Sequence, residues 1–363
     1  MAPGLGGKQI GELDIVPTGR LFENEVMPDI PEEQYAKFRK DPRYQVEIVW
    51  RNVLIFFVLH VLAVVGAYMA VARAMGLTLL FTLVLLFWGG FGVTAGAHRL
   101  WAHRTYKARL PLRLFLTFCQ TLALQNSLYE WCRDHRLHHK FSETDADPHN
   151  ARRGFFFAHM GWLMCKKHPE VKEKGKVLDM KDLLEDPCVY YQRKFYIPLI
   201  LLIWGVFPTA VPVYFWGEDV AVAMLFSVFF RYVFSLHCTW LVNSAAHLYG
   251  NKPFDKFINA AENVRVAYAA LGEGWHNYHH VFPWDYKTSE LGDYSVNLTK
   301  MFIDSMAFIG QAYDLKTVSR EVILARAART GDGTHPSAND GNASGASDGD
   351  AKAMHPRQRL VVS

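Results

Sequence analysis

NVLIFFVLHVLAVVGAYMAVA (residues 52–72) is an apolar stretch of the length that crosses a lipid bilayer, and it is one of four in this chain. The others are LTLLFTLVLLFWGGFGVTAGA (77–97), FYIPLILLIWGVFPTAVPVYFW (195–216) and VAVAMLFSVFFRYVFSLHCTWLV (220–242). About 20 apolar residues, at a rise of about 1.5 Å each, span the roughly 30 Å hydrocarbon layer. A single stretch could be a buried helix of a soluble protein, but four in two close pairs favour a membrane protein. We therefore predict an all-α integral membrane protein with four transmembrane helices.

The distribution of basic residues predicts the orientation of these helices. The links after the first and third stretches are short, RAMG (73–76) and GED (217–219), whereas the segment 98–194 is long and rich in lysine and arginine. The positive-inside rule places this segment in the cytosol, and four spans then place both termini there. Within it, residues 111–125 are apolar but too short to cross the bilayer, so we expect an interfacial or re-entrant helix.

Both ends of the chain are polar. Residues 1–45 contain no apolar core of a signal peptide. Residues 329–363 are rich in Gly, Ser, Asp and Ala, and we expect them to be disordered. The intervening residues 46–328 should form one domain.

A net charge of +4 gives no indication of a nucleic-acid partner, and five cysteines without a C-x-x-C pair fit a reducing environment.

Histidines are concentrated next to the predicted spans. The segment DHRLHHKFSETDADPH (134–149) contains one H-x-x-H-H triplet, and WHNYHH (275–280) contains another. A pair follows the second span, and a single histidine follows the fourth. The predicted topology brings all of them to one side of the membrane. The nine candidate ligands are His98, His103, His135, His138, His139, His247, His276, His279 and His280.

The spacing of these histidines is typical of a metal site. Positions i, i+3 and i+4 share one face of a helix, so we expect each triplet to converge on a transition metal, which imidazole binds well. His98 and His103 lie five residues apart, about 140° around an ideal helix. Either that helix is distorted, or the two histidines serve different metals. Nine ligands suit two ions better than one.

Other residues nearby have simpler interpretations or supporting roles. Isolated histidines are more often ordinary core or surface residues, and this applies to His60, His159, His168 and His237. Metal-bound histidines usually donate their second ring N–H to a carboxylate or a carbonyl. The acids available for this role are Glu130, Asp134, Glu143, Asp145, Asp147, Glu262 and Glu273.

Over roughly residues 45–330 the chain resembles the membrane acyl-CoA desaturases, most closely the stearoyl-CoA type of animals as found in insects. The motifs that carry the resemblance are TAGAHRLWAHRTYK (94–107), DHRLHHKFSETDADPHN (134–150), RGFFFAHMGWL (153–163), TWLVNSAAH (239–247) and GEGWHNYHHVFPWDY (272–286). The resemblance implies a cytosolic helical cap in which the nine histidines hold two iron ions and Asn243 holds a metal-bound water.

The resemblance also implies the reaction and its partners. A cis double bond would be inserted at Δ9 into stearoyl-CoA or palmitoyl-CoA, with O2 and two electrons from cytochrome b5 and its reductase. The enzyme would lie in the endoplasmic reticulum membrane, in contact with lipid. A fused cytochrome b5 domain, a flavin motif and a nicotinamide motif are not evident in the sequence, so the electrons must come from a separate protein.

The family's substrate contacts can be carried over to matching positions. Those of the CoA head group are Asn52, Asn126, Arg133, Asp134, Lys166 and Lys167, and those at the bend of the acyl tunnel are Gln125, Trp131 and Thr239. Basic side chains suit the polyanionic CoA group. Without the resemblance, Lys166 and Lys167 would fit a positive membrane-surface patch equally well.

Three questions remain open at the level of the sequence. Leu86 and Gly90 lie one turn apart before His98 and would border the far part of the tunnel, but Gly90 would also suit close helix packing. Arg231, in the middle of the fourth stretch, should face the protein interior or a cavity, where it either contacts the substrate or caps backbone carbonyls. Two other functions also fit the histidine pattern: a hydroxylase on the same scaffold, and a zinc-binding membrane scaffold or transporter without redox activity.

Overall fold

The computed structural model describes residues 17–25, 46–291 and 293–337. Four of its helices are long and apolar enough to cross a membrane, as predicted, which makes the chain a multi-pass membrane protein. They are Trp50–Ala72, Gly76–Ala102, Tyr196–Trp216 and Val220–Leu248. The second and fourth continue past their apolar stretches to Ala102 and Leu248, and so they carry histidines at their ends.

These four helices are built from α-helical and π-helical sections. The first is α2 (Trp50–Ala72), and the second joins α3 (Gly76–Phe91) to the π-helix η1 (Gly92–Ala102). The third joins α10 (Tyr196–Ile200), η4 (Leu201–Val206) and α11 (Phe207–Trp216). The fourth joins α12 (Val220–Val222), η5 (Ala223–Phe230), α13 (Arg231–Asn243) and α14 (Ala245–Leu248).

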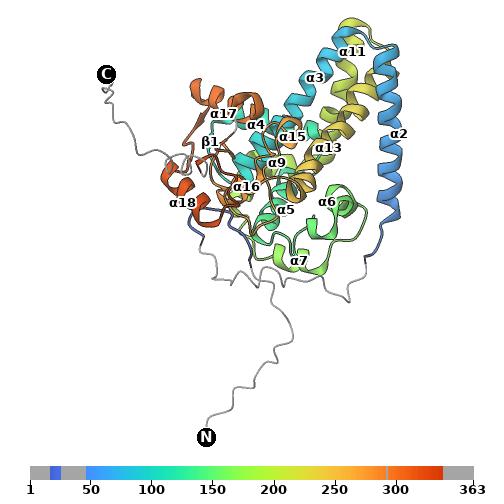
Figure 1. The fold of residues 1–363 in the computed structure, drawn as a ribbon. Coiled ribbons are helices and arrows are strands. Elements are labelled where there is room, and N and C mark those ends of the chain that lie inside the picture. Colours follow the sequence, from blue (N-terminus) through green and yellow to red (C-terminus); the bar gives the residue numbers. More distant parts are fainter. Residues whose placement is uncertain (1–16, 26–45, 292, 338–363) are drawn as a thin grey trace, which may run out of the picture.

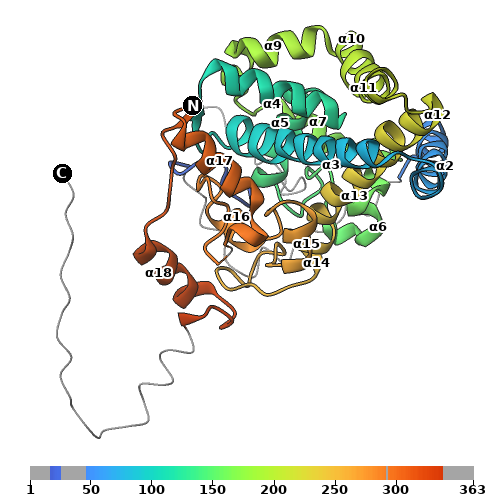
Figure 2. The same ribbon diagram turned by 90° about the horizontal axis from the view of Figure 1, so that it is seen from above.

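The remaining helices form a cap that lies beside and below the membrane-spanning ones (Figure 1). They are α4 (Leu110–Ala123), α5 (Leu128–Lys140), η2 (Ala151–Arg153), α6 (Phe155–His159), η3 (Gly161–Leu163), α7 (Pro169–Gly175), α8 (Lys181–Glu185), α9 (Pro187–Lys194), α15 (Val264–Ala269), α16 (His276–Val281), η6 (Tyr294–Val296), α17 (Leu298–Phe308) and α18 (Arg320–Thr330). Helix α4 coincides with the short apolar helix that we expected at 111–125, and it packs against α3 and η1 (Figure 2).

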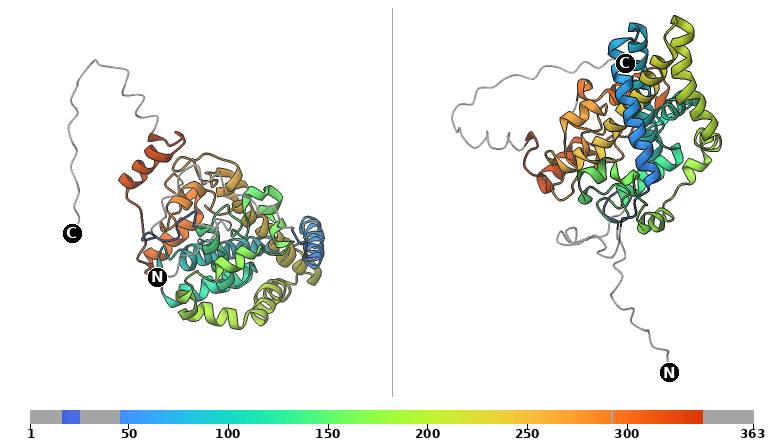
Figure 3. Two further views of the ribbon diagram at one scale, coloured as in Figure 1. Left: turned by 90° about the horizontal axis from the view of Figure 1, so that it is seen from below. Right: turned by 90° about the vertical axis from the view of Figure 1, so that its right-hand side faces the viewer.

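The four membrane helices differ in how much of their surface the protein covers. Helix α2 lies at the edge of the molecule (Figures 2 and 3) and exposes large apolar side chains such as Phe57, Val64 and Val71, a surface suited to lipid. The share of buried residues is 11% in the first and third helices, but 33% in the second and 50% in the fourth. The second and fourth helices are therefore the ones that reach into the cap.

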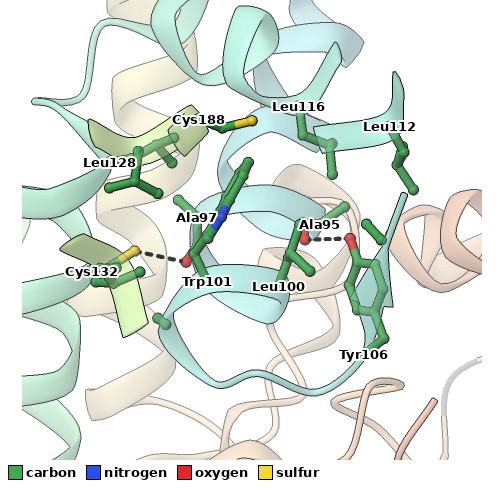
Figure 4. Packing of buried hydrophobic residues seen from close by; sticks show 14 of the residues in the cluster. Ala95, Ala97, Leu100, Trp101, Tyr106, Leu112, Leu116, Leu128, Cys132 and Cys188 are labelled. Carbon is green, nitrogen blue, oxygen red and sulfur yellow. Dashed lines mark hydrogen bonds between the residues drawn. The ribbon is translucent and has the colours of Figure 1, made fainter. Parts of the chain in front are cut away.

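A buried apolar cluster fixes η1 against the cap (Figure 4). Ala95 and Ala97 of η1 pack with Leu116 of α4 and Cys132 of α5. Two hydrogen bonds hold the same contact, because the Tyr106 hydroxyl donates to the Ala95 carbonyl at 2.8 Å and the Cys132 thiol lies 3.3 Å from the Ala97 carbonyl. Helix α5 begins at Ser127, whose hydroxyl accepts from the N–H of Glu130 as an N-cap. Two segments that carry histidines are thus held in fixed register.

A short strand pair and the start of the C-terminal tail differ from what we expected. β1 (Lys107–Ala108) pairs antiparallel with β2 (Ala312–Tyr313), a strand pair too short to be recognised from the sequence. The C-terminal tail that we expected to be disordered, 329–363, starts before α18 ends, and its first residues are described as far as 337. The rest of that tail lies outside the described residues, as does most of the polar segment 1–45.

Candidate metal centre and its cavity

The nine histidines come together in two groups, although they lie far apart in the sequence. In each group the potential ligand atoms all lie within 4.8 Å of one another. The five-histidine group consists of His98, His103, His135, His139 and His279, and the four-histidine group of His138, His247, His276 and His280. Seven of these nine residues are buried, and the other two are partly buried.

The division of the triplets corrects our expectation that each would converge on one ion. In α5, His135 and His139 belong to the five-histidine group, but His138 belongs to the other. In α16 the order is reversed, since the i, i+4 pair shares the four-histidine group and His279 joins the other. Positions i and i+4 are about 40° apart on a helix, whereas i+3 and i+4 are about 100° apart. Each triplet therefore reaches both groups and cross-links them.

The arrangement of His98 and His103 follows from a distorted helix, which was one of our two alternatives. Residues Gly92–Ala102 form a π-helix, and the N–H of His103 donates to the carbonyl of His98 at 3.1 Å. In this i to i+5 pattern, residues five apart lie near each other on one face. The two imidazole rings are consequently 4.9 Å apart and share the five-histidine group.

Carboxylates orient three of the ligand histidines. The Nδ1 atom of His98 lies 2.8 Å from Glu273, that of His138 lies 3.0 Å from Asp147, and that of His247 lies 2.9 Å from Glu143. Of the other acids that we expected here, Glu130 pairs with Arg193, Asp134 with Arg133, and Glu262 accepts from the N–H of Tyr278.

The charge state of Glu273 follows from its partners. Burial by itself would raise the pKa of Glu273, but Arg99 and His98 outweigh it and lower the pKa to about 2. Glu273 is therefore ionised and accepts the Nδ1–H of His98, which leaves Nε2 with a free lone pair.

The free ring nitrogens face one another at distances that suit a bound metal. Nε2–Nε2 distances are 2.8 Å for His103 and His135, 2.9 Å for His98 and His279, and 3.3 Å for His138 and His280. Lone pairs that face each other repel unless a cation lies between them. Ligand nitrogens about 2.1 Å from a first-row metal would lie about 3.0–3.4 Å apart, close to these values.

The protonation state of the histidines also fits metal binding. Burial, with neighbouring imidazoles adding to it, lowers the pKa of His135, His139 and His279 well below the usual value. The same causes act on His276 and His280. Neutral imidazole is the form that binds metals, so both groups are ready to accept an ion at neutral pH.

An apolar cavity of about 300 Å³ reaches both groups. Its walls include His98 and His135 from the five-histidine group and His138 and His276 from the four-histidine group. The apolar part of the lining comes from α3, η1, α13 and the segment that follows α15, and it contains Leu83, Leu86, Phe87, Gly90, Val93, Phe234 and Leu271. An unbranched hydrocarbon would find apolar contacts along this wall and potential metal ligands at its end.

A second cavity, of about 200 Å³, begins where the first one ends. Trp131, His135, Thr239 and Asn243 line both cavities. The Trp131 ring is stacked on that of His135 with centroids 4.9 Å apart. Nearby, the Gln125 amide donates to the Thr239 hydroxyl at 2.9 Å. All three residues that we assigned to the bend of the tunnel are thus next to the junction of the two cavities.

The residues assigned to the CoA head group lie in the wall of the second cavity or near it. Asn126 and Asp134 line that cavity. Asp134 forms ion pairs with Arg133 and Lys167. The remaining two lie at the start of α2 and beside it: Asn52 donates to the Leu163 carbonyl at 2.8 Å, and Lys166 pairs with the exposed Glu47.

The structure answers the question about Arg231. Its side chain is 1% exposed and donates to the carbonyls of Ser227, at 2.7 Å, and Leu122, at 3.1 Å. Leu122 lies in the last turn of α4, where carbonyls lack helical partners. Arg231 therefore ties the end of α4 to the fourth membrane helix, and α4 leads directly into Gln125.

One residue that the sequence analysis missed lies against the centre. His149 is buried, its ring lies 4.4 Å from that of His138, and it forms a third potential ligand group with His138 and Asp147. It is an isolated histidine, so no H-x-x-H-H spacing marked it as a candidate metal ligand. The isolated histidines His60, His159 and His237 instead form a separate hydrogen-bonded chain through Nε2 of His60, both ring nitrogens of His237 and Nε2 of His159.

Comparison with known proteins identifies the family. A model of the fatty acid desaturase family matches residues 73–302. The chain belongs to the fatty acid desaturase family. It is similar to the acyl-CoA Delta-9 desaturase of Acheta domesticus, with 56% identity over 325 residues that cover 88% of this chain and 90% of the relative.

Two further relatives are similar to it over most of the chain. The acyl-CoA Delta12-desaturase of the same cricket is 54% identical over 328 residues (88% of this chain, 90% of the relative). The stearoyl-CoA desaturase of Homo sapiens is 52% identical over 319 residues (87% and 88%). Membership in this desaturase family and the two histidine groups together indicate a metal cofactor.

Proposed function

We propose that this chain is an acyl-CoA desaturase that inserts a cis double bond at Δ9 into stearoyl-CoA or palmitoyl-CoA. The observation that carries the proposal is the apolar cavity whose wall contains histidines of both groups. Hydrogen can be removed from one chosen pair of unactivated methylenes only if the chain is held rigidly past the reactive centre. The names of the cricket and human relatives support an acyl-CoA substrate.

We assign the five-histidine and four-histidine sets as ligands of two iron ions, and Asn243, which lines both cavities, as the residue that holds a metal-bound water. Iron would supply the activation of O2 that desaturation needs. Zinc could occupy the same histidines but has no redox chemistry. Glu273, Asp147 and Glu143 orient three of the ligands by accepting their Nδ1–H groups, and burial keeps water away from the rings.

The second cavity provides the route to the CoA head group. We assign Arg133 and Lys167 to its phosphates, because both cations pair with Asp134 in the wall of this cavity. Asn52, Asn126 and Lys166 complete the assigned contacts. The bend formed by Gln125, Trp131 and Thr239 would then place the middle of the acyl chain next to the histidines.

The remaining assignments concern the cell rather than the site. We propose that both termini and the cap face the cytosol of the endoplasmic reticulum membrane, as the basic segment 98–194 predicts. We assign residues 46–328 to the desaturase domain. Cytochrome b5, with its reductase, is the proposed electron donor. If an acidic donor docks on the basic cap, turnover at limiting donor should fall as ionic strength rises.

The experiment is expression of the chain in a cell that lacks its own desaturase, followed by analysis of fatty acids with the position of each double bond. We expect Δ9 monounsaturated products from the native chain and none from His279→Ala. The control Gly175→Ala should give the same products as the native chain, because the added carbon meets no other part of the described protein within 4 Å. Δ12 products would contradict the position, hydroxylated products would indicate a hydroxylase, and iron-free protein without products would contradict the enzyme.

A further inference from the structure

Residues 17–25, which we name the strap, lie across the end of the histidine-bearing helix α5, near the base of the molecule (Figures 1 and 3). The N–H of Thr18 donates to the carbonyl of Lys140 at 2.8 Å, and the Thr18 hydroxyl donates to the carbonyl of Ser142 at 2.8 Å. The Lys140 ammonium lies 3.5 Å from Glu25 at the other end of the strap. These contacts join two segments more than a hundred residues apart.

Gly19 brings the strap into direct contact with a candidate metal ligand. A Cβ atom added at Gly19 would overlap with the backbone carbonyl oxygen of His139. That neighbour is backbone in the last turn of α5, so it cannot swing away as a side chain would. Only glycine permits this close approach. Any larger residue at position 19 must lift the strap from α5.

Leu21 anchors the middle of the strap in the protein interior, because its side chain is only 2% exposed. Glu25 holds this part of the strap in place by accepting from the N–H of Leu21 at 2.6 Å.

Phe22 closes the outer side of the same contact. The guanidinium of Arg104, the residue after His103, lies 3.7 Å from the centre of the Phe22 ring. The guanidinium of Arg136, next to His135, lies 5.6 Å from it. The strap thus reaches His139 itself and the chain neighbours of His103 and His135, and these three histidines belong to the five-histidine group. The strap lies outside residues 73–302, which the family model matches.

We propose that the strap holds the end of α5 and the chain next to His103 in place, closes the five-histidine group, and thereby slows the loss of the metal bound there. The inference rests on the proposed function, since it requires a metal at this group. Loss of a contact that positions a metal ligand typically weakens metal binding by about 10–100-fold.

The test measures metal release from the purified full-length protein, loaded with iron(II), into a coloured iron(II) chelator. We compare the native chain with Gly19→Ala and Leu21→Ser. The matched control is Gly175→Ala, a glycine substitution at a position where the added carbon has open space around it. Release from two sites should give two phases. We expect the strap variants to accelerate one phase at least about tenfold and to leave the other unchanged, with Gly175→Ala like the native chain.

The outcomes separate the strap from a general loss of structure and from the proposed function. Equal release rates in the native chain and both strap variants would overturn the role of the strap, while the desaturase proposal would stand on its products. Acceleration of both phases together, with a lower unfolding temperature, would mean that the strap only supports the fold and would also overturn the proposal. A native chain that takes up no iron would overturn both proposals.

Discussion

Gly90→Leu should shift the substrate preference of the protein toward shorter acyl chains. A Cβ atom at Gly90 would lie 2.5 Å from Cδ1 of Leu271, and both residues line the cavity that leads to the histidines. The nearest obstacle is the end of a flexible side chain, so the fold can accept a larger residue here. Close helix packing, the alternative role, is found instead at Gly92, where the added atom would overlap with the backbone of α4 at Cys119 and Gln120.

The size of the effect follows from the volume lost. A leucine side chain adds four carbon atoms to a cavity of about 300 Å³ that has a close-packed wall. If two terminal methylenes of an eighteen-carbon chain lose their place, the loss of burial is about 1.6 kcal/mol at about 0.8 kcal/mol for each CH2. That difference corresponds to about a 15-fold change in the ratio of activities on stearoyl-CoA and palmitoyl-CoA.

The assay measures this activity ratio together with iron content. Gly90→Leu should retain iron and lower the ratio of the activity on the eighteen-carbon substrate to that on the sixteen-carbon substrate, because it narrows the cavity without changing the histidines. Gly92→Ala is the control for helix packing, and it should lower yield and iron content together without changing the ratio. An unchanged ratio in a folded, iron-loaded Gly90→Leu variant would refute the assignment of this cavity to the acyl chain.

Three further substitutions test other parts of the account. Glu143→Gln removes the carboxylate on Nδ1 of His247 and should weaken iron binding at the four-histidine group about 10–100-fold, measured by metal analysis, with the other iron retained. Burial raises the pKa of Glu262 to about 8 from its usual 4.5, so its contribution to stability is present below pH 4.5 and is lost as pH rises toward 8. Glu262→Gln should therefore raise the thermal unfolding temperature at pH 8 and leave it unchanged at pH 4.5; the reverse order would contradict this sign. Arg231→Met leaves the Leu122 carbonyl without its donor and should cost about 1–3 kcal/mol in unfolding experiments, whereas an unchanged stability would show that this contact is dispensable.

The sequence predicted the membrane helices and the candidate ligands because both depend on local patterns. An apolar run of bilayer length is visible without knowledge of its neighbours, and the predicted starts and ends differ from the observed ones mainly where the second and fourth helices continue into the cap. The H-x-x-H-H spacing identified the ligand candidates for the same reason. Whether the nine histidines hold iron remains a prediction.

The distribution of ligands between two groups depends on contacts that no local pattern contains. His138 and His139 are adjacent in sequence, yet they face different groups. The end of the second membrane helix supplies ligands to one group, the fourth membrane helix supplies a ligand to the other, and α16 supplies ligands to both. The strap and His149 were missed for a related reason. Residues 17–25 have the composition of a polar terminal segment, and only the tertiary structure shows Gly19 against His139.

Anomalous X-ray scattering at the iron edge, from crystals of the purified protein, tests the central claim most directly. Two peaks are predicted for each chain, one among His98, His103, His135, His139 and His279, and one among His138, His247, His276 and His280. A single peak, a peak away from these rings, or a signal at the zinc edge in place of iron would contradict the account of two iron sites beside the cavity.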